Sequence, residues 1–248
     1  MINLIFFTFG LTIGSFLNGV IYRLPEGKSL VKPRSHCMNC GTTLKVFDLI
    51  PIFSYLINKG KCRYCGEKIS LQYPLIELLT AVLFLLTYIN FGLTIKTFVY
   101  LYLLSLLIAA AVIDYQRQII PNKITYVGFI SGLFFAIVFN YISFQTAIIG
   151  SLIPALFLLL IILIYPQGMG MGDLKLVAII GIFTGWQVPL IGIFIGSFIG
   201  VIIALPFLIS GKFNSKTKLP FGPLIITGSL IMMFWGEELI NFYFNLFL

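Results

Sequence analysis

Two aspartates at the ends of long apolar segments are the residues best suited to acid–base chemistry. Asp114 follows the apolar stretch 97–113, and Asp173 precedes the stretch 174–188. Charges so near a membrane interior are costly, which marks both as functional candidates. When two carboxylates share a site, one can take a proton from water while the other donates to a carbonyl oxygen. The pair predicts hydrolysis. The alternative is helix capping or ion pairing with nearby cations, namely Arg117, Lys123 or Lys175.

Glycines alternate with methionines immediately before the second aspartate, at Gly168, Gly170 and Gly172. Such a backbone can approach another chain closely, so Gly170 and Gly172 are candidate substrate-binding residues, a plain loop being the alternative. A third carboxylate near the spans, Glu77, is also a substrate-binding candidate. Its alternative is a helix-terminal acid that faces Lys68 or a lipid head group.

All four cysteines lie between residues 37 and 65, in two Cys-x2-Cys motifs that are each followed by glycine. Two such knuckles separated by 21 residues are typical of a structural zinc site with Cys37, Cys40, Cys62 and Cys65 as ligands. A redox dithiol and simple buried cysteines are the alternatives. His36 lies outside the spacing and is expected to be a loop residue.

The elements that position these residues are predicted to be membrane helices. Of the 248 residues, 59% are hydrophobic and only 10% are charged, which excludes a soluble domain, a secreted disulfide scaffold, a disordered chain and a nucleic-acid binder. Continuous apolar runs favour helices over spanning strands. We therefore expect an all-α polytopic membrane protein with about eight spans, near 2–22, 74–92, 97–113, 124–142, 146–165, 174–188, 189–209 and 222–246.

The basic residues predict the orientation of these spans. If the N-terminus is outside, 15 of the 16 lysines and arginines fall in the inner segments, which are 23–73, 114–123, 166–175 and 210–221. The positive-inside rule favours this arrangement, and parity places both aspartates on the inner face. The first apolar segment lacks a basic start and a cleavage site, so it is expected to be a retained helix. The expected parts are the first helix (1–22), a basic inner loop (23–73) and a seven-helix domain (74–248).

Several motifs together are similar to those of a known family. They are the stretch from Gly14 to Pro25 (GSFLNGVIYRLP), the two cysteine knuckles, Asp114 before Ile120-Pro121-Asn122, and Gly170-Met171-Gly172-Asp173. Tyr73-Pro74-Leu75-Ile76-Glu77-Leu78 and Pro220-Phe221-Gly222-Pro223 match further segments. The chain resembles the type IV prepilin peptidases, membrane aspartic proteases of the Gly-x-Gly-Asp class. It departs from their pattern at Gly19, Gln116 and Asn122, where valine, aspartate and aspartate are more usual.

The resemblance implies an enzyme of the bacterial plasma (inner) membrane, with Asp114 and Asp173 as the catalytic pair. Its substrates would be prepilins or pseudopilins, whose basic leader is cut after a glycine at the cytoplasmic face. Many members also methylate the new N-terminus with S-adenosylmethionine. No nucleotide-binding fingerprint identifies a site for that cofactor, and Glu77 and the large loop are the places to look.

Three alternatives remain. A proton-coupled transporter could use Asp114 and Asp173 as relay carboxylates, although such a protein favours acids at mid-membrane and an internal repeat. A zinc-loop membrane adaptor gives no reason for the Gly-Met-Gly-Asp motif. A signal peptide peptidase-like protease is not expected to carry the cysteine loop.

Overall fold

The computed structural model describes residues 1–166, 169–209 and 220–247. Gly168 and most of the predicted inner segment 210–221 lie outside these ranges. The described chain is helical, and its only strand-type pairings are two isolated bridges, His36 with Thr43 and Lys61 with Lys68. It divides into two compact units, Met1–Ala109 and Ala110–Leu248. The all-α class predicted from the apolar runs is thus confirmed.

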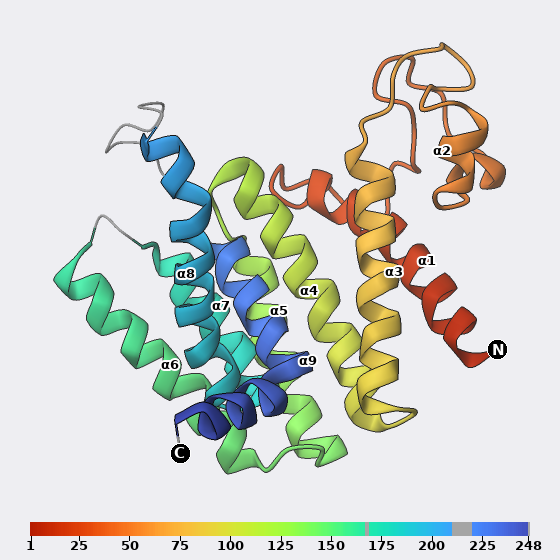
Figure 1. Cartoon of the computed structure of the whole chain (residues 1–248). Coiled ribbons are helices and arrows are strands. Elements are labelled where there is room, and N and C mark those ends of the chain that lie inside the picture. The colour runs from red at the N-terminus through yellow and green to blue at the C-terminus, as the bar shows by residue number, and fades with distance from the viewer. Residues whose placement is uncertain (167–168, 210–219, 248) are drawn as a thin grey trace. The chain divides into compact units, whose positions relative to one another are not determined.

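The first unit is built on two packed helices, α1 (Ile2–Arg23) and α3 (Gln72–Phe91). Between them the chain forms a loop with a short 3-10 helix, η1 (Val46–Leu49), and a short helix, α2 (Phe53–Ile57) (Figure 1). A Cβ at Gly14 would lie 2.6 Å from the Cα of Glu77, so glycine lets the two backbones approach closely. This contact brings the start of α3, with Glu77, against α1.

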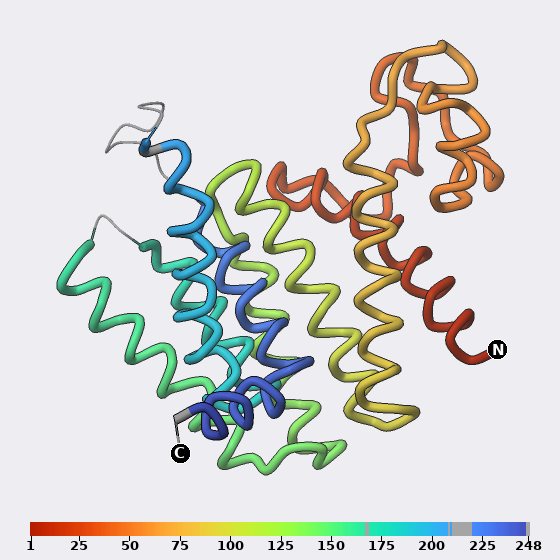
Figure 2. The backbone as a smooth tube through the Cα atoms, in the orientation of Figure 1, coloured from red at the N-terminus to blue at the C-terminus, as the bar shows by residue number. Residues whose placement is uncertain are grey.

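The second unit surrounds a short central helix, α7 (Met171–Thr184). This helix contacts α5 (Asn122–Phe139), α6 (Phe144–Ile164), α8 (Gln187–Ile209) and α9 (Phe221–Phe247). The tube trace in Figure 2 lets the reader follow these helices through the unit. Every residue of α7 from Leu176 to Phe183 is buried. The core of this unit is therefore α7 itself, and Asp173 is its third residue.

Helix α4 (Ile95–Arg117) runs from the first unit into the second and ends three residues after Asp114. Seven described helices are long and apolar enough to cross a membrane: α1, α3, α4, α5, α6, α8 and α9. The chain is thus a multi-pass membrane protein.

The predicted sixth span, 174–188, corresponds to α7, which has only 14 residues. At 1.5 Å per residue such a helix is about 21 Å long, against about 30 Å for the hydrocarbon core. Gly185, with a φ of +84°, ends the helix before the predicted segment ends. Helix α7 is covered by its four neighbouring helices instead of by lipid. A protein interior and lipid both favour apolar side chains, so the sequence of α7 resembles that of a lipid-exposed span.

Candidate active site and cysteine cluster

Asp114 lies in the last turn of α4 and is 7% exposed. Its Oδ2 accepts a hydrogen bond of 3.1 Å from the backbone N–H of Gly222, at the start of α9. A Cβ at Gly222 would lie only 2.6 Å from that oxygen, so glycine is the residue that leaves room for the carboxylate. The carboxylate is thus held between the end of one helix and the beginning of another.

Asp173 lies in the first turn of α7 and is 8% exposed. Its Oδ2 accepts a hydrogen bond of 3.0 Å from the backbone N–H of Gly170, the residue that caps the helix. A negative charge in this position interacts favourably with the helix dipole. Asp173 therefore does cap its helix, which was the alternative to a catalytic role. Capping uses only Oδ2, so Oδ1 is available for other chemistry.

The two aspartates are close enough for their charges to interact. Within the described ranges the ion pairs are Lys28 with Glu26 and Arg63 with Asp48, so neither aspartate is half of an ion pair there. Lys175, one of the cations considered as a partner, instead donates to Asn122 Oδ1 at 2.8 Å. Two buried carboxylates that contact backbone N–H groups and lie near each other can divide the roles of acid and base.

The two glycines before Asp173 have different surroundings. A Cβ at Gly170, which has extended backbone with φ −96° and ψ 156°, would make an ordinary contact of 3.7 Å with Asp173 Oδ2. A Cβ at Gly172 would press on Ile120, with 3.3 Å to its Cβ. Both glycines thus adjoin the aspartate, and Gly172 also packs against the segment that follows α4.

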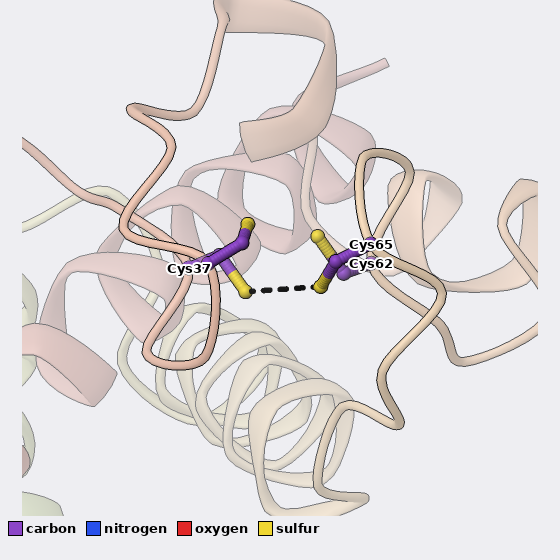
Figure 3. Close-up of side chains that lie close together, drawn as sticks. Cys37, Cys62 and Cys65 are labelled. Carbon is purple, nitrogen blue, oxygen red and sulfur yellow. Dashed lines mark hydrogen bonds between the residues drawn. The ribbon is translucent and has the colours of Figure 1, made fainter.

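The first unit brings the four cysteines together. The sulfur atoms of Cys37, Cys40, Cys62 and Cys65 all lie within 4.8 Å of one another, as the prediction of a single site requires. Figure 3 shows Cys37 facing Cys62 and Cys65 across a narrow space, and the sulfurs of Cys37 and Cys65 are 3.8 Å apart. A tetrahedral zinc with Zn–S bonds of about 2.3 Å has S···S edges of about 3.8 Å. The cluster therefore suits a tetrahedral metal ion.

The two knuckles have the same local structure. In the first, Gly41 N–H donates to the carbonyl of Cys37, and in the second Gly66 N–H donates to that of Cys62, both at 2.9 Å. Both glycines have positive φ, +68° and +73°, a conformation that other residues rarely adopt. Hydrogen bonds with the hydroxyl and backbone of Thr42 lower the pKa of the Cys40 thiol to about 6, whereas burial and the neighbouring cysteines raise the pKa of the Cys65 thiol to about 11. In the metal-free cluster Cys40 is therefore ionised before Cys65.

Glu77 belongs to the first unit and is 6% exposed. One carboxylate oxygen accepts a hydrogen bond of 2.7 Å from the backbone N–H of Ile52, just before α2. The acid therefore joins α3 to the cysteine loop. His36 lies beside the cluster, with Nδ1 2.9 Å from the carbonyl oxygen of Arg34, and is not among the four clustered ligands.

Comparison with known proteins identifies the family. A model of the bacterial peptidase A24 N-terminal domain matches residues 8–91, and a model of the type IV leader peptidase family matches residues 101–205. A prepilin leader peptidase/N-methyltransferase of Bacillus subtilis is 37% identical over 98% of each chain. The chain belongs to the type IV leader peptidase family. The predicted resemblance is thus confirmed, and the transporter alternative is not favoured.

Other leader peptidases are similar over almost the same length. Proteins of the same name from Legionella pneumophila and Pseudomonas putida are 33% and 30% identical. The matches cover 95% and 93% of this chain, and 92% and 89% of those proteins. No solved structure is significantly similar to the chain.

In this leader peptidase, two residues have surroundings that the sequence motifs do not predict. Gly222, within the segment Pro220–Pro223, contacts Asp114 directly. Asn18, within the amino-terminal signature, is 4% exposed, and its Oδ1 has no hydrogen-bond partner among the described residues. A polar residue inside an apolar helix is the signal that could have drawn attention to Asn18.

Proposed function

We propose that this protein is a prepilin leader peptidase and N-methyltransferase. It would cleave the basic leader of prepilin-like proteins after a glycine and then methylate the new N-terminus. The observation that carries the peptidase function is the pair of buried aspartates, Asp114 and Asp173, each held by one backbone N–H donor. The names of the similar full-length relatives support both activities.

The hydrogen bonds of the two carboxylates support the proposed catalytic roles. Because Gly222 and Gly170 each bind an Oδ2, Oδ1 of each aspartate is the oxygen left to exchange protons. The ionised aspartate takes a proton from water, whose oxygen attacks the scissile carbonyl carbon. The protonated aspartate donates to the carbonyl oxygen. Collapse of the tetrahedral intermediate breaks the C–N bond, and the leaving amine takes up a proton.

The glycine of the substrate would pass beside Gly170 and Gly172. Extended backbone at Gly170 offers a partner along which a peptide can lie, and neither glycine has a side chain to hold the scissile carbonyl away from the aspartates. The leader and the loop 23–73 are both basic, so the leader's charges are expected near the buried acids instead of the loop. The apolar segment that follows the cut would rest in the membrane between helices.

The site is proposed to face the cytoplasm, with the N-terminus of the chain outside. Support comes from the distribution of charge. If α7, although short and covered by protein, crosses together with the seven longer helices, 15 of the 16 lysines and arginines fall in inner segments. The hydrogen bond from Gly222 to Asp114, which puts the start of α9 beside the end of α4, agrees with this topology. The cysteine loop 23–73 then lies in a reducing compartment, where disulfides are disfavoured and metal binding by thiolates is favoured. The plasma membrane of a bacterium is the proposed location, since the similar leader peptidases come from bacteria.

We also propose that the four cysteines hold one structural zinc ion. The spread of the sulfurs, within 4.8 Å of one another, and the two equivalent glycine turns support this assignment. Bound zinc would link the two knuckles, and through Ile52 and Glu77 the ordered loop would be joined to α3. Glu77 is the proposed binding residue of the first unit, where its buried carboxylate suits a ligand with positive charge.

The proposed function is tested with the purified full-length protein in lipid nanodiscs. A substrate with a basic leader, a glycine and an apolar segment is added, and its products are measured by mass spectrometry. We expect cleavage directly after the glycine. When S-adenosylmethionine is present, the mature product should gain the mass of one methyl group. A protein that retains its helical content but leaves the substrate intact would contradict the peptidase function.

A further inference from the structure

The first unit contains a cavity of about 430 Å³ that the proposed peptidase chemistry does not use. Its walls come from α1, the cysteine loop and the start of α3, and both Glu77 and Asn18 line it. Its volume lies within the range of about 300–1,000 Å³ in which proteins bind small ligands and cofactors. Because every lining residue belongs to the first unit, the cavity is a property of that unit alone.

The buried polar groups of this cavity are hydrogen-bond acceptors. The amide nitrogen of Asn18 donates to the carbonyls of Gly14 and Tyr73, at 3.3 and 3.1 Å, so its orientation is set. Its Oδ1 is buried and has no hydrogen-bond partner within the described part of the chain. Unsatisfied buried polar atoms are rare in proteins, and one that lines a cavity is typically completed by a ligand or water.

Glu77 adds a negative charge to the same cavity. Its Oε2 accepts the Ile52 N–H, and its side chain is almost fully enclosed. A carboxylate and an unpartnered amide oxygen together call for a ligand that presents hydrogen-bond donors or positive charge.

Aromatic rings form part of the remaining wall. Five of the lining residues carry an aromatic side chain: Phe16, Tyr22, Tyr55, Tyr64 and Tyr73. The faces of such rings attract cations and stack on flat heterocycles. The lining also carries four basic side chains, Arg23, Lys61, Arg63 and Lys68, none of which is buried, and two further acids, Asp48 and Glu67. The buried carboxylate of Glu77 and the buried amide of Asn18, together with the aromatic surface, are the features that recognise a cationic nucleoside.

We propose that this cavity binds S-adenosylmethionine, with Glu77 facing its positive charge and Asn18 Oδ1 accepting a hydrogen bond from it. The proposal rests on the proposed methylation and assigns the site where the methyl donor is held. When bound, the cofactor supplies an electrophilic methyl group on a sulfonium. The residues of this chain bind and orient it: Glu77 balances the charge, Asn18 selects a donor group, and the aromatic wall excludes water.

Binding is measured directly, without reliance on catalysis. The full-length protein in nanodiscs is titrated with S-adenosylmethionine by isothermal calorimetry. In parallel it is irradiated with the methyl-tritiated compound, and the labelled peptides are mapped. We expect one site per chain and label on peptides that contain lining residues of α1, the cysteine loop or α3. Label confined to the second unit, or label that excess unlabelled S-adenosylmethionine does not displace, would overturn the assignment.

Two pairs of variants locate the site. Glu77→Gln keeps the shape of the side chain and removes its charge, so the affinity should fall about tenfold or more. Glu238→Gln, at an exposed position of α9, is its control and should bind normally. Gly19 lines the cavity, and a Cβ there meets nothing within 4 Å, so Gly19→Phe can fill the space without a backbone clash while Gly19→Ala leaves it open. We expect binding to be lost in Gly19→Phe and kept in Gly19→Ala.

The metal content of each preparation shows whether the loop is intact, so that loss of binding is not confused with unfolding. If Gly19→Phe and Glu77→Gln both retain wild-type affinity, the cavity is not the site. Failure of the proposed function looks different, since the wild-type protein would then neither cut the substrate nor methylate it. If the wild-type protein cleaves and methylates the substrate, and both variants bind S-adenosylmethionine with wild-type affinity, the proposed function stands and only this inference is refuted.

Discussion

The backbone N–H of Gly222 donates a hydrogen bond to the carboxylate of Asp114 across 108 residues of sequence. The distance is 3.1 Å, and the missing side chain of Gly222 is what allows it, because a Cβ would lie 2.6 Å from the same oxygen. This contact sets the rotamer of the first aspartate from the far end of the second unit. The start of α9 is therefore part of the proposed catalytic machinery.

Gly222→Ala should impair cleavage strongly. The added methyl group would displace the Asp114 carboxylate, and a shift of about 1 Å in a catalytic group can cost about 100-fold in rate. Initial rates of leader cleavage in nanodiscs provide the measurement. Gly19→Ala, whose Cβ meets nothing within 4 Å, is a control for replacing a glycine in a helix. If Gly222→Ala cleaves at the wild-type rate, Gly222 does not position the catalytic carboxylate.

Asp114→Asn and Asp173→Asn should each abolish cleavage, because an amide can neither take up nor release the proton that the reaction needs. The double variant should have the same residual cleavage rate as either single variant, because the two residues act as a unit and the loss of one already removes the function of both. Circular dichroism and thermal unfolding would verify that each variant is folded. Glu238→Gln is a matched control on an exposed surface. If a single variant keeps cleavage activity that the double variant lacks, the two residues act separately.

The part of the fold that was predictable from sequence depends on local patterns. Continuous apolar runs identify the membrane helices, since the length of a bilayer-crossing helix is fixed by the membrane. The helix break near Gly185 was also visible, as a polar and proline-containing interruption of the long apolar stretch 174–209. What the pattern could not reveal is that α7 has only 14 residues and is covered by four other helices. Lipid and buried protein select the same apolar side chains, so composition does not separate them.

In the candidate site, too, local patterns were predictable from the sequence and tertiary contacts were not. The spacing of the cysteines predicted the cluster because each knuckle is a local turn. The contacts of Asp114 with Gly222, and of Glu77 with Ile52, join residues 108 and 25 positions apart and depend on tertiary packing. No periodicity reports such contacts. The unpartnered Oδ1 of Asn18 is likewise a consequence of which atoms its amide group meets in the folded protein.

The metal site gives a prediction of stability. Purified, reduced protein that has not met a chelator should contain about one zinc per chain, measured by plasma mass spectrometry. Cys37→Ser should lower that content to near zero and make the loop 23–73 sensitive to trypsin, because the knuckles are no longer linked through the ion. Treatment of the wild-type protein with a strong chelator should have the same effect. A wild-type protein without zinc but with a protease-resistant loop would contradict a structural metal.

The last prediction concerns the room that Gly172 leaves beside the catalytic aspartate. Gly172→Leu should cripple cleavage, because the side chain would occupy the path proposed for the substrate's glycine and would also press on Ile120. Replacement of the substrate's glycine by leucine should have a similar effect on the wild-type enzyme, for the same steric reason.

Two causes could slow the Gly172→Leu enzyme, namely crowding of the substrate path and poorer packing against Ile120, and Gly172→Ala can separate them. Its Cβ would lie 3.3 Å from the Cβ of Ile120 and 3.5 Å from its Cγ1 and Cδ1. Ile120→Gly removes all three atoms, so in that background Gly172→Ala should cost no thermal stability. If the double variant is as stable as Ile120→Gly alone and still cuts more slowly, crowding of the substrate path is the cause. Recovery of full cleavage together with stability would show instead that Gly172 serves only the packing of α7 against Ile120.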